Sequence, residues 1–285
     1  MRQRLVVYLQ LVKFSHTVFA LPFALMGAFL AARGAPTLRV ALWMIAAVVG
    51  ARTCAMTFNR LADRRFDALN PRTATRALAT GVVAPWEART MVVVAGATFV
   101  LSCAELNALA LELAPLMLAM TLGYSLTKRI TWGSHLFLGG ALALAPLGGW
   151  VAVGGDLHGY PLTLSLSVLF WVAGFDIVYA CLDETVDRRL GLYSVPARFG
   201  RGPAMRLARC CHVVAFVGFA ATGWSCSLGR LYAVGLLVAG GALLFEHLLV
   251  TPRTLDRIQL SFFTMNSVVS VVLFAATWLA LVAGR

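Results

Sequence analysis

The sequence predicts an all-α, polytopic membrane protein with nine transmembrane helices. Hydrophobic residues make up 60% of the 285 positions and the mean hydropathy is +0.82, more apolar surface than a soluble domain of this length needs. Apolar stretches of about 18 residues or more recur along the chain, as they do in helical membrane proteins. A helix satisfies its backbone hydrogen bonds within one segment, so helices are the expected spanning elements.

The apolar stretches define the expected membrane spans in order. The third and fourth spans are separated only by a short turn near Asn107, and Gly and Pro interrupt several spans, which membrane helices tolerate. The first stretch contains His16 and Pro22 and lacks a clear small-residue cleavage site, so we expect it to be a span and not a removed signal. The expected spans are residues 14–32, 40–60, 90–106, 108–126, 134–153, 161–182, 206–226, 231–250 and 263–283.

Lysine and arginine residues are distributed unevenly between the two ends of these spans. With nine spans, 19 of the 24 Lys and Arg residues lie on the side of the N-terminus, four lie on the opposite side, and Arg52 lies within a span. Positively charged loops stay in the cytoplasm. The sequence therefore predicts an integral membrane protein with its N-terminus on the cytoplasmic side. This orientation explains the net charge of +12, so we expect no binding to nucleic acid.

A first cluster of polar residues follows the second expected span. Asn59, Asp63 and Asp67 are spaced four residues apart, so on a continuous helix they form one stripe. Oxygen side chains in this pattern suit Mg²⁺, which binds one or two carboxylates together with substrate phosphate oxygens. The alternative is a solvated helix end in which these aspartates pair with Arg64 and Arg65.

Basic residues near this stripe are candidates for anion binding. Arg72 lies in the following segment NPRTATR, and Lys128 and Arg129 follow the fourth span on the same side of the membrane. Such side chains can contact the oxygens of a diphosphate. Arg52 lies seven residues before Asn59 and hence on the same helical face. A buried guanidinium needs an anionic partner, either a carboxylate of the protein or that of a substrate.

A second stripe of polar residues ends the sixth expected span. Asp176, Tyr179, Asp183 and Asp187 are separated by three, four and four residues, which places them on one face of a helix. Alone, Asp176 would be read as a hydrogen-bonded core residue and Tyr179 as an interface aromatic. Four adjacent polar groups on an apolar helix instead predict a wet, charged cavity.

The spacing of the aspartates suggests an internal repeat. Asp63 and Asp67 recur as an identically spaced pair 120 residues later. Two parallel halves of four helices, about residues 14–126 and 134–250, would place the pairs on opposite walls of one central cavity. We therefore expect a single domain over residues 1–285, with both pairs at a cavity mouth that faces the cytoplasm.

The three motifs resemble those of the UbiA superfamily of intramembrane aromatic prenyltransferases. Residues 59–67 match the family pattern N-D-x-x-D-x-x-x-D, except that Arg60 replaces the first aspartate and excludes that position as a metal ligand. Residues 176–187 match D-x-x-Y-x-x-x-D-x-x-x-D completely. Residues 124–129 are similar to the family's Y-x-x-x-K-R segment, and the match spans residues 13 to 270.

This resemblance implies nine helices around a central cavity that opens to the cytoplasm, and Mg²⁺-dependent transfer of a polyprenyl group from its diphosphate to an aromatic ring. The implied metal ligands are Asn59, Asp63, Asp67, Asp183 and Asp187. The four aspartates, with Tyr179, would be the catalytic residues. The implied substrate-binding residues are Arg52, Arg72, Lys128, Arg129 and Asp176.

Three further segments indicate a branch of the family. Residues 16–25, 194–200 and 262–266 look like those of 4-hydroxybenzoate polyprenyltransferases, and especially of enzymes proposed to prenylate 1,4-dihydroxy-6-naphthoate on the futalosine route to menaquinone. Both acceptors are phenolic aromatic carboxylic acids, so the ubiquinone and menaquinone routes stay open. The alternatives are haem O synthase, a (bacterio)chlorophyll synthase, a non-catalytic scaffold, or a transporter, whose charges would lie near the bilayer midplane.

Four histidines show no spacing that is typical of metal ligands, so we expect them to be structural. They are His135, His158, His212 and His247.

Overall fold

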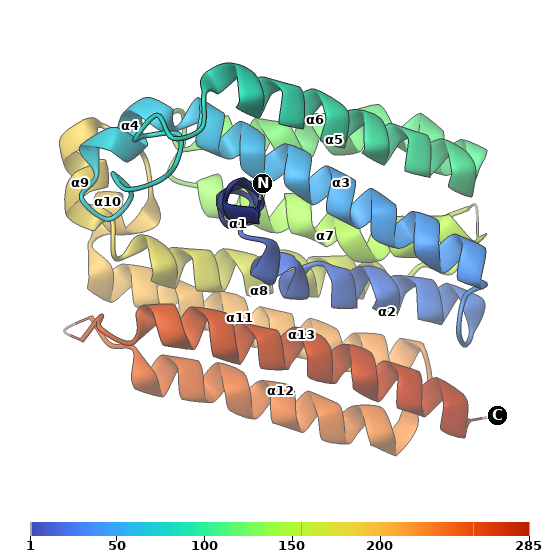
Figure 1. Cartoon of the computed structure of the whole chain (residues 1–285). Helices are drawn as coiled ribbons and strands as arrows, with labels where there is room; N and C mark the ends of the chain where they lie inside the picture. The colour runs from blue at the N-terminus through green and yellow to red at the C-terminus, as the bar shows by residue number, and fades with distance from the viewer. Residues whose placement is uncertain (1, 155, 253, 285) are drawn as a thin grey trace.

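The computed structural model describes residues 2–154, 156–252 and 254–284, which are largely helical as predicted. The long helices run side by side as a bundle, and the short helices α4, α9 and α10 gather at one end (Figure 1). The long helices are α2 (Leu21–Ala32), α3 (Leu38–Ala62), α5 (Pro85–Leu106), α6 (Ala108–Thr127), α7 (Ser134–Gly154), α8 (Leu162–Ala180), α11 (Arg201–Ser225), α12 (Gly229–Leu249) and α13 (Ile258–Ala283). The short ones are α1 (Arg2–Leu11), the 3₁₀ helix η1 (Phe14–Phe19), α4 (Arg64–Leu69), α9 (Glu184–Leu190) and α10 (Val195–Phe199).

Within these described ranges, eight helices are long and apolar enough to cross a membrane. The first expected span, 14–32, is instead a 3₁₀ turn followed by the 12-residue helix α2. Its apolar part, Thr17–Ala32, is shorter than the other spans, so the predicted count of nine is not confirmed. Pro22 occupies the first turn of α2, where its missing N–H is tolerated.

Glycines allow α2 to pack closely against α7. A Cβ atom added to Gly149 would lie 1.9 Å from the carbonyl oxygen of Ala24, and one added to Gly27 would lie 2.0 Å from that of Pro146. Side chains at these positions would push the two helices apart. The close contact seats α2 within the bundle despite its short length.

An aromatic core fills the half of the bundle built from α2, α8, α11 and α13. Phe23 stacks on Phe219 at 5.7 Å between ring centroids and contacts Trp171 at 5.1 Å. All three side chains are fully buried. The other half, built from α3, α5 and α6, has a smaller core that includes Ala47, Ala110 and Ala114.

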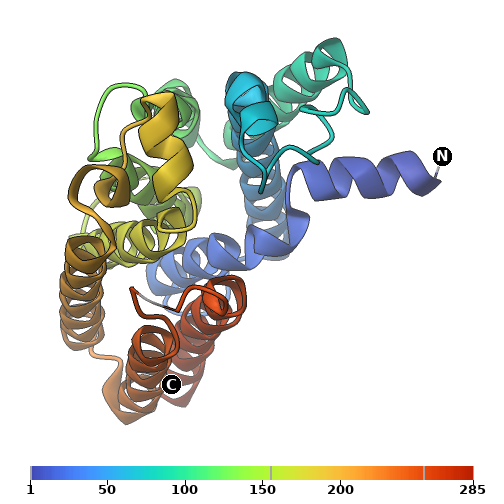
Figure 2. The ribbon, with the colours of Figure 1, turned by 90° about the vertical axis from the view of Figure 1, so that its left-hand side faces the viewer.

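The loop that joins α4 to α5 is held in place by α1. Arg4 and Tyr8 both donate hydrogen bonds to Oε1 of Glu87 in the first turn of α5, at 2.7 and 2.9 Å. Leu11 packs against the buried side chains of Leu78 and Val83 in the loop itself. In the view from the end of the bundle, α1 extends away from the other helices (Figure 2). It therefore supports the loop that carries Arg72.

Candidate active site

A cavity of about 430 Å³ runs along α3, α5, α6, α7 and α8, from the end of the bundle where the short helices gather. One end of its lining is charged. Of the residues predicted to form the site, all but Arg129 line this cavity. Those that do are Arg52, Asn59, Asp63, Asp67, Arg72, Lys128, Asp176, Tyr179, Asp183 and Asp187.

Each aspartate pair lies across a break between a long helix and a short one. The helix α3 ends before Asp63, whose backbone adopts φ −89° and ψ 5°, and α8 ends three residues before Asp183, with φ −104° and ψ 2°. The prediction of continuous helices through both stripes is therefore wrong. The two aspartates of each pair nevertheless remain one helical turn apart. The amide of Asp67 donates to the carbonyl of Asp63 at 2.8 Å, and the amide of Asp187 donates to the carbonyl of Asp183 at 2.7 Å.

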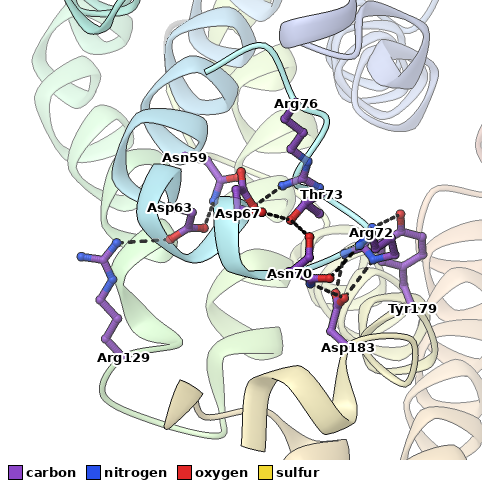
Figure 3. A network of polar contacts seen from close by, with 10 residues as sticks. All are labelled: Asn59, Asp63, Asp67, Asn70, Arg72, Thr73, Arg76, Arg129, Tyr179 and Asp183. Carbon is purple, nitrogen blue, oxygen red and sulfur yellow. Dashed lines mark hydrogen bonds and ion pairs between the residues drawn. The ribbon is translucent and has the colours of Figure 1, made fainter. Parts of the chain in front are cut away.

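Arg72 joins the first polar cluster to the second. Its Nε donates to Oδ1 of Asp183 at 2.9 Å, its Nη2 donates to Oδ2, and its Nη1 donates to the hydroxyl of Tyr179 at 2.9 Å. Asn70 adds a 2.8 Å hydrogen bond to Oδ1 of Asp183. The loop after α4 thus bridges to the end of α8 (Figure 3). Burial raises the pKa of Asp183, but Arg72 and Asn70 outweigh it and hold that pKa below its ordinary value.

The two aspartates of the first cluster also pair with arginines. Arg76 contacts Oδ1 of Asp67 at 2.7 Å, and Arg129 contacts Oδ1 of Asp63 at 3.2 Å (Figure 3). Arg129 itself does not line the cavity. Asn59 donates to Oδ2 of Asp63 at 3.2 Å. Burial raises the pKa of Asp63, although its hydrogen bond to Arg129 lowers it.

The described residues contain no group of three or more His, Cys, Asp or Glu side chains close enough together to hold a metal ion. We call the charged end of the cavity the mouth. A metal ion there would share the carboxylates of the aspartates with their arginine partners. Asp187 differs from the other aspartates, because its Oδ2 atom is buried without a hydrogen-bond partner in the described ranges. Burial raises the pKa of Asp187, and the nearby Lys128 opposes that shift.

Lys128 lies among several aspartates. Its burial would lower its pKa, but the charges of Asp187, Asp176, Asp183 and Asp63 outweigh burial and raise that pKa. The ammonium group therefore stays charged at neutral pH. It can offer donors to an anion that enters the mouth.

Arg52 has no carboxylate partner among the described residues. Its Nη2 donates to the carbonyl oxygen of Lys13 at 3.3 Å, and its Nε is buried without a hydrogen-bond partner in the same ranges. Pairing with a carboxylate of the protein, one of the two sequence-based alternatives, is therefore not observed. The guanidinium remains available to an anionic ligand in the cavity.

Sequence reasoning missed Lys13, which also lines the cavity. Its backbone is left-handed, with φ 45° and ψ 58°, between α1 and η1. Burial and the charges of Arg60, Arg76, Arg72 and Arg52 lower its pKa to about 8. Nothing in its local sequence marks it, because it reads as one more basic residue on the cytoplasmic side.

The histidine His135 was expected to be structural, but it contacts a predicted site residue. Its Nδ1 lies 2.6 Å from Oδ2 of Asp176. Asp176 and His135 are 41 residues apart in the chain, so spacing could not connect them. The available signal was its place at the start of a span on the side of the acidic stripes.

Away from its charged end, the lining of the cavity is mostly apolar and runs along α3, α5, α6 and α7. It reaches Leu106 and Ala110, at the far ends of α5 and α6 from the charged mouth, and includes Ala47, Met117 and Gly148. We call this part the apolar arm. A cavity with a charged mouth and an apolar arm fits a ligand with an anionic head and a hydrocarbon tail.

The sequence model of the UbiA prenyltransferase family matches residues 20–268. This chain belongs to the UbiA prenyltransferase family. The UbiA resemblance drawn from the three motifs is thus confirmed, and so is the prediction of an enzyme, a prenyltransferase in an α-helical membrane protein. A transporter or a scaffold is not supported.

Named relatives and solved UbiA structures agree with this assignment. A 4-hydroxybenzoate octaprenyltransferase of Nitrosospira multiformis is 32% identical over 279 residues, which are 96% of this chain and 94% of that protein. A UbiA homologue of Aeropyrum pernix K1 superimposes with a TM-score of 0.85 and 37% identity, over 92% of this chain and 96% of that one. An Archaeoglobus fulgidus UbiA homologue bound to DMAPP and Mg²⁺ shares the fold, with a TM-score of 0.77 and 20% identity over 96% of this chain and 99% of that one.

Proposed function

We propose that this prenyltransferase moves a polyprenyl group from polyprenyl diphosphate to a phenolic aromatic carboxylic acid in quinone biosynthesis. The observation that carries the proposal is the continuity of the charged mouth with the apolar arm in one cavity. The arm suits an isoprenoid chain and the mouth suits its diphosphate. The name of the Nitrosospira relative favours 4-hydroxybenzoate as the acceptor. The acid 1,4-dihydroxy-6-naphthoate carries the same functional groups and is the second acceptor to test.

Mg²⁺ is the proposed cofactor, and the donor types of the mouth suit it, although Asp63, Asp67 and Asp183 are paired with arginines in this structure. Carboxylates are the oxygen ligands that this hard cation prefers. The buried Oδ2 of Asp187 has no hydrogen-bond partner in the described ranges, and a carboxylate oxygen buried in that way is costly. A bound cation would supply its partner. The residues that would hold the ion are Asn59, Asp63, Asp67, Asp183 and Asp187.

When bound, Mg²⁺ neutralises the negative charge that grows on the leaving diphosphate. Arg72 and Lys128 would contact the phosphate oxygens directly, since both line the mouth and Arg forks match phosphate geometry. Arg129 would act from the edge, where it also holds Asp63. These cations stabilise the same developing charge in a site of low dielectric constant.

In the transfer, the allylic C–O bond breaks and its electron pair leaves with the diphosphate. The allylic carbon gains cationic character, and an electron-rich ring carbon of the acceptor forms the new C–C bond before the ring loses its proton. Tyr179 lies beside the mouth, and its ring contacts that of Phe262 at 4.6 Å between centroids. The Arg72 guanidinium lies over the Tyr179 ring, 5.1 Å from its centroid, so the ring would stabilise the allylic cation only through a face that Arg72 leaves open.

We assign the carboxylate of the acceptor to Arg52, with Lys13 next to it. Both line the cavity, and neither forms an ion pair with a carboxylate in the described part of the chain. The carboxylate of the acceptor would supply the anionic partner that the Arg52 guanidinium lacks. We further infer that the mouth faces the cytoplasm of a bacterial inner membrane, because 19 of 24 basic residues lie on that side in the nine-span arrangement.

The test is product formation in membranes that contain the wild-type chain, Mg²⁺, labelled polyprenyl diphosphate and each acid in turn, read by mass spectrometry. The variants Asp63→Ala and Asp183→Ala, at matched expression, are expected to lose turnover. Wild-type turnover in either variant would defeat the assignment of the mouth. No prenylated product from either acid in the wild-type chain would defeat the proposed acceptor class.

A further inference from the structure

His135 connects two parts of the mouth that are remote in sequence. It lies in the first turn of α7, and its side chain is 1% exposed, while that of Asp176 is 20% exposed and lines the cavity. Nδ1 of His135 lies 2.6 Å from Oδ2 of Asp176. On its other side, Nε2 accepts a hydrogen bond from the backbone N–H of Val195 at 3.2 Å.

These two contacts fix the tautomer of the imidazole. A backbone N–H can only donate, so Nε2 of His135 carries no proton and Nδ1 carries it. The Nδ1–H group then donates to Oδ2 of Asp176, which is the accepting oxygen of this pair. Hydrogen bonds at both ring nitrogens hold the ring in one orientation, and with it the carboxylate.

Asp176 differs from the paired aspartates of the mouth. Asp63, Asp67 and Asp183 each contact an arginine, whereas the ion pair that Asp176 makes in the described ranges is with His135. Its second oxygen, Oδ1, has no hydrogen-bond partner among the described residues. Asp176 lies one turn before the end of α8, deeper in the bundle than Asp183. Asp176 thus offers an acceptor oxygen deeper in the cavity than the residues proposed to bind diphosphate.

Val195 belongs to a segment that is also attached to the rest of the mouth. The N–H of the neighbouring Tyr193 donates to the carbonyl of Lys128 at 2.7 Å. The segment directly follows α9, which carries Asp187. One imidazole therefore links the deep carboxylate on α8 to the chain that follows the second aspartate pair.

We propose that His135 is a positioning residue of the transfer reaction, which aims Oδ1 of the Asp176 carboxylate at the hydroxyl group of the aromatic acceptor. This inference rests on the proposed function. A carboxylate that accepts a hydrogen bond from the phenolic hydroxyl orients the ring and increases its electron density. Arg52 at the carboxylate and Asp176 at the hydroxyl would then hold the acceptor at its two polar ends.

Two amide substitutions separate the two contacts of His135. In His135→Asn the amide nitrogen can take the place of Nδ1 and donate to Asp176, but the contact to Val195 is lost. In His135→Gln the amide oxygen can take the place of Nε2 and accept from Val195, but the donor to Asp176 is lost. Both variants are neutral and polar, so each is the control for the other.

The experiment measures KM and kcat for the acceptor and for the prenyl diphosphate in membranes with matched amounts of each variant. Loss of a hydrogen bond to a charged group costs about 10- to 100-fold in affinity or rate. We expect His135→Gln to raise the acceptor KM by about this factor and leave the KM of prenyl diphosphate near the wild-type value. We expect His135→Asn to retain most of the wild-type acceptor KM.

Two results would overturn the inference. Equal acceptor KM values in the Asn and Gln variants, or parallel increases in the KM of both substrates, would show that His135 only supports the fold. A wild-type chain that prenylates neither acid would instead defeat the proposed function and this inference with it. Product from the wild-type chain therefore distinguishes the two failures.

Discussion

Arg72 bonds Asp183 and Tyr179 through one guanidinium, so its removal should disturb the second polar stripe and release the loop after α4 from it. In Arg72→Ala three hydrogen bonds are lost, and Asp183, whose side chain is 8% exposed, loses its ion-pair partner. Hydrogen bonds to charged groups contribute about 1.5–3 kcal/mol each and are not additive. Because the Arg72 side chain is 24% exposed, we expect a total loss of about 2–3 kcal/mol of stability.

The effect of Arg72→Ala on catalysis should be larger than its effect on folding. Loss of one preorganised charge that faces the leaving group typically costs about 10²–10³ in kcat, or about 3–4 kcal/mol. The assay is single-turnover product formation at saturating acceptor, alongside thermal unfolding in detergent. The variant Arg72→Lys keeps the charge but loses the two-pronged contact to Asp183, so its rate should lie between those of wild type and Arg72→Ala.

A matched control for this experiment is Arg65→Ala. Arg65 is exposed in the same region of the chain and does not line the cavity, so its removal should leave both the rate and the melting temperature near the wild-type values. The reasoning is refuted if Arg72→Ala turns over at the wild-type rate, or if Arg65→Ala loses as much activity as Arg72→Ala.

Three further predictions follow from the cavity and the helix packing. The pKa of Lys13 is lowered to about 8, so its positive charge is present below pH 8 and lost above it. The KM of the acceptor should therefore rise as the pH increases through 8. This rise should vanish in Lys13→Arg, which stays charged. Gly149→Ala would place its Cβ 1.9 Å from a carbonyl oxygen and should cost about 1–3 kcal/mol in thermal unfolding, whereas Gly123→Ala, with nothing within 4 Å, should not destabilise the fold. Chelation of Mg²⁺ should abolish product formation and re-addition should restore it; turnover that resists the chelator would contradict the proposed metal site.

The long spans could be predicted from the sequence because hydropathy alone decides which segments enter a membrane. The turn at Asn107 was predicted for the same reason, and in the structure its side chain caps α6 and also donates to the carbonyl of Val151 at 2.8 Å. The first span differs because composition does not report backbone conformation. An apolar run over 14–32 has the expected hydropathy whether it is one helix or a 3₁₀ turn followed by a short helix.

The sequence predicted polar residues that, Arg129 excepted, line one cavity, but it did not predict the contacts between them. The periodicity of the acidic stripes brings each stripe to one face, and all of their members line the cavity. The pairing of Arg72 with Asp183 joins residues 111 positions apart, which no local pattern encodes. The same is true of His135 with Asp176, and of Lys13, whose importance depends on the fold of the segment around it.

The breaks at Asp63 and Asp183 support the internal repeat suggested by spacing. Both residues have nearly the same backbone angles, and each is followed by a short helix, α4 with six residues and α9 with seven. We infer that the two sequence repeats, about 14–126 and 134–250, are related units of a single domain. Such a relation would explain why the same helix break occurs at Asp63 and again at Asp183.

The arginine–aspartate pairs at the mouth have a consequence for the order in which ligands bind. A dication alone would meet carboxylates whose charge is already compensated by Arg72, Arg76 and Arg129, and a diphosphate alone would meet compensated guanidiniums. Each alone would have to displace these partners. A dication–diphosphate complex would offer new partners to the carboxylates and the guanidiniums at once, so we expect the two to enter the mouth together.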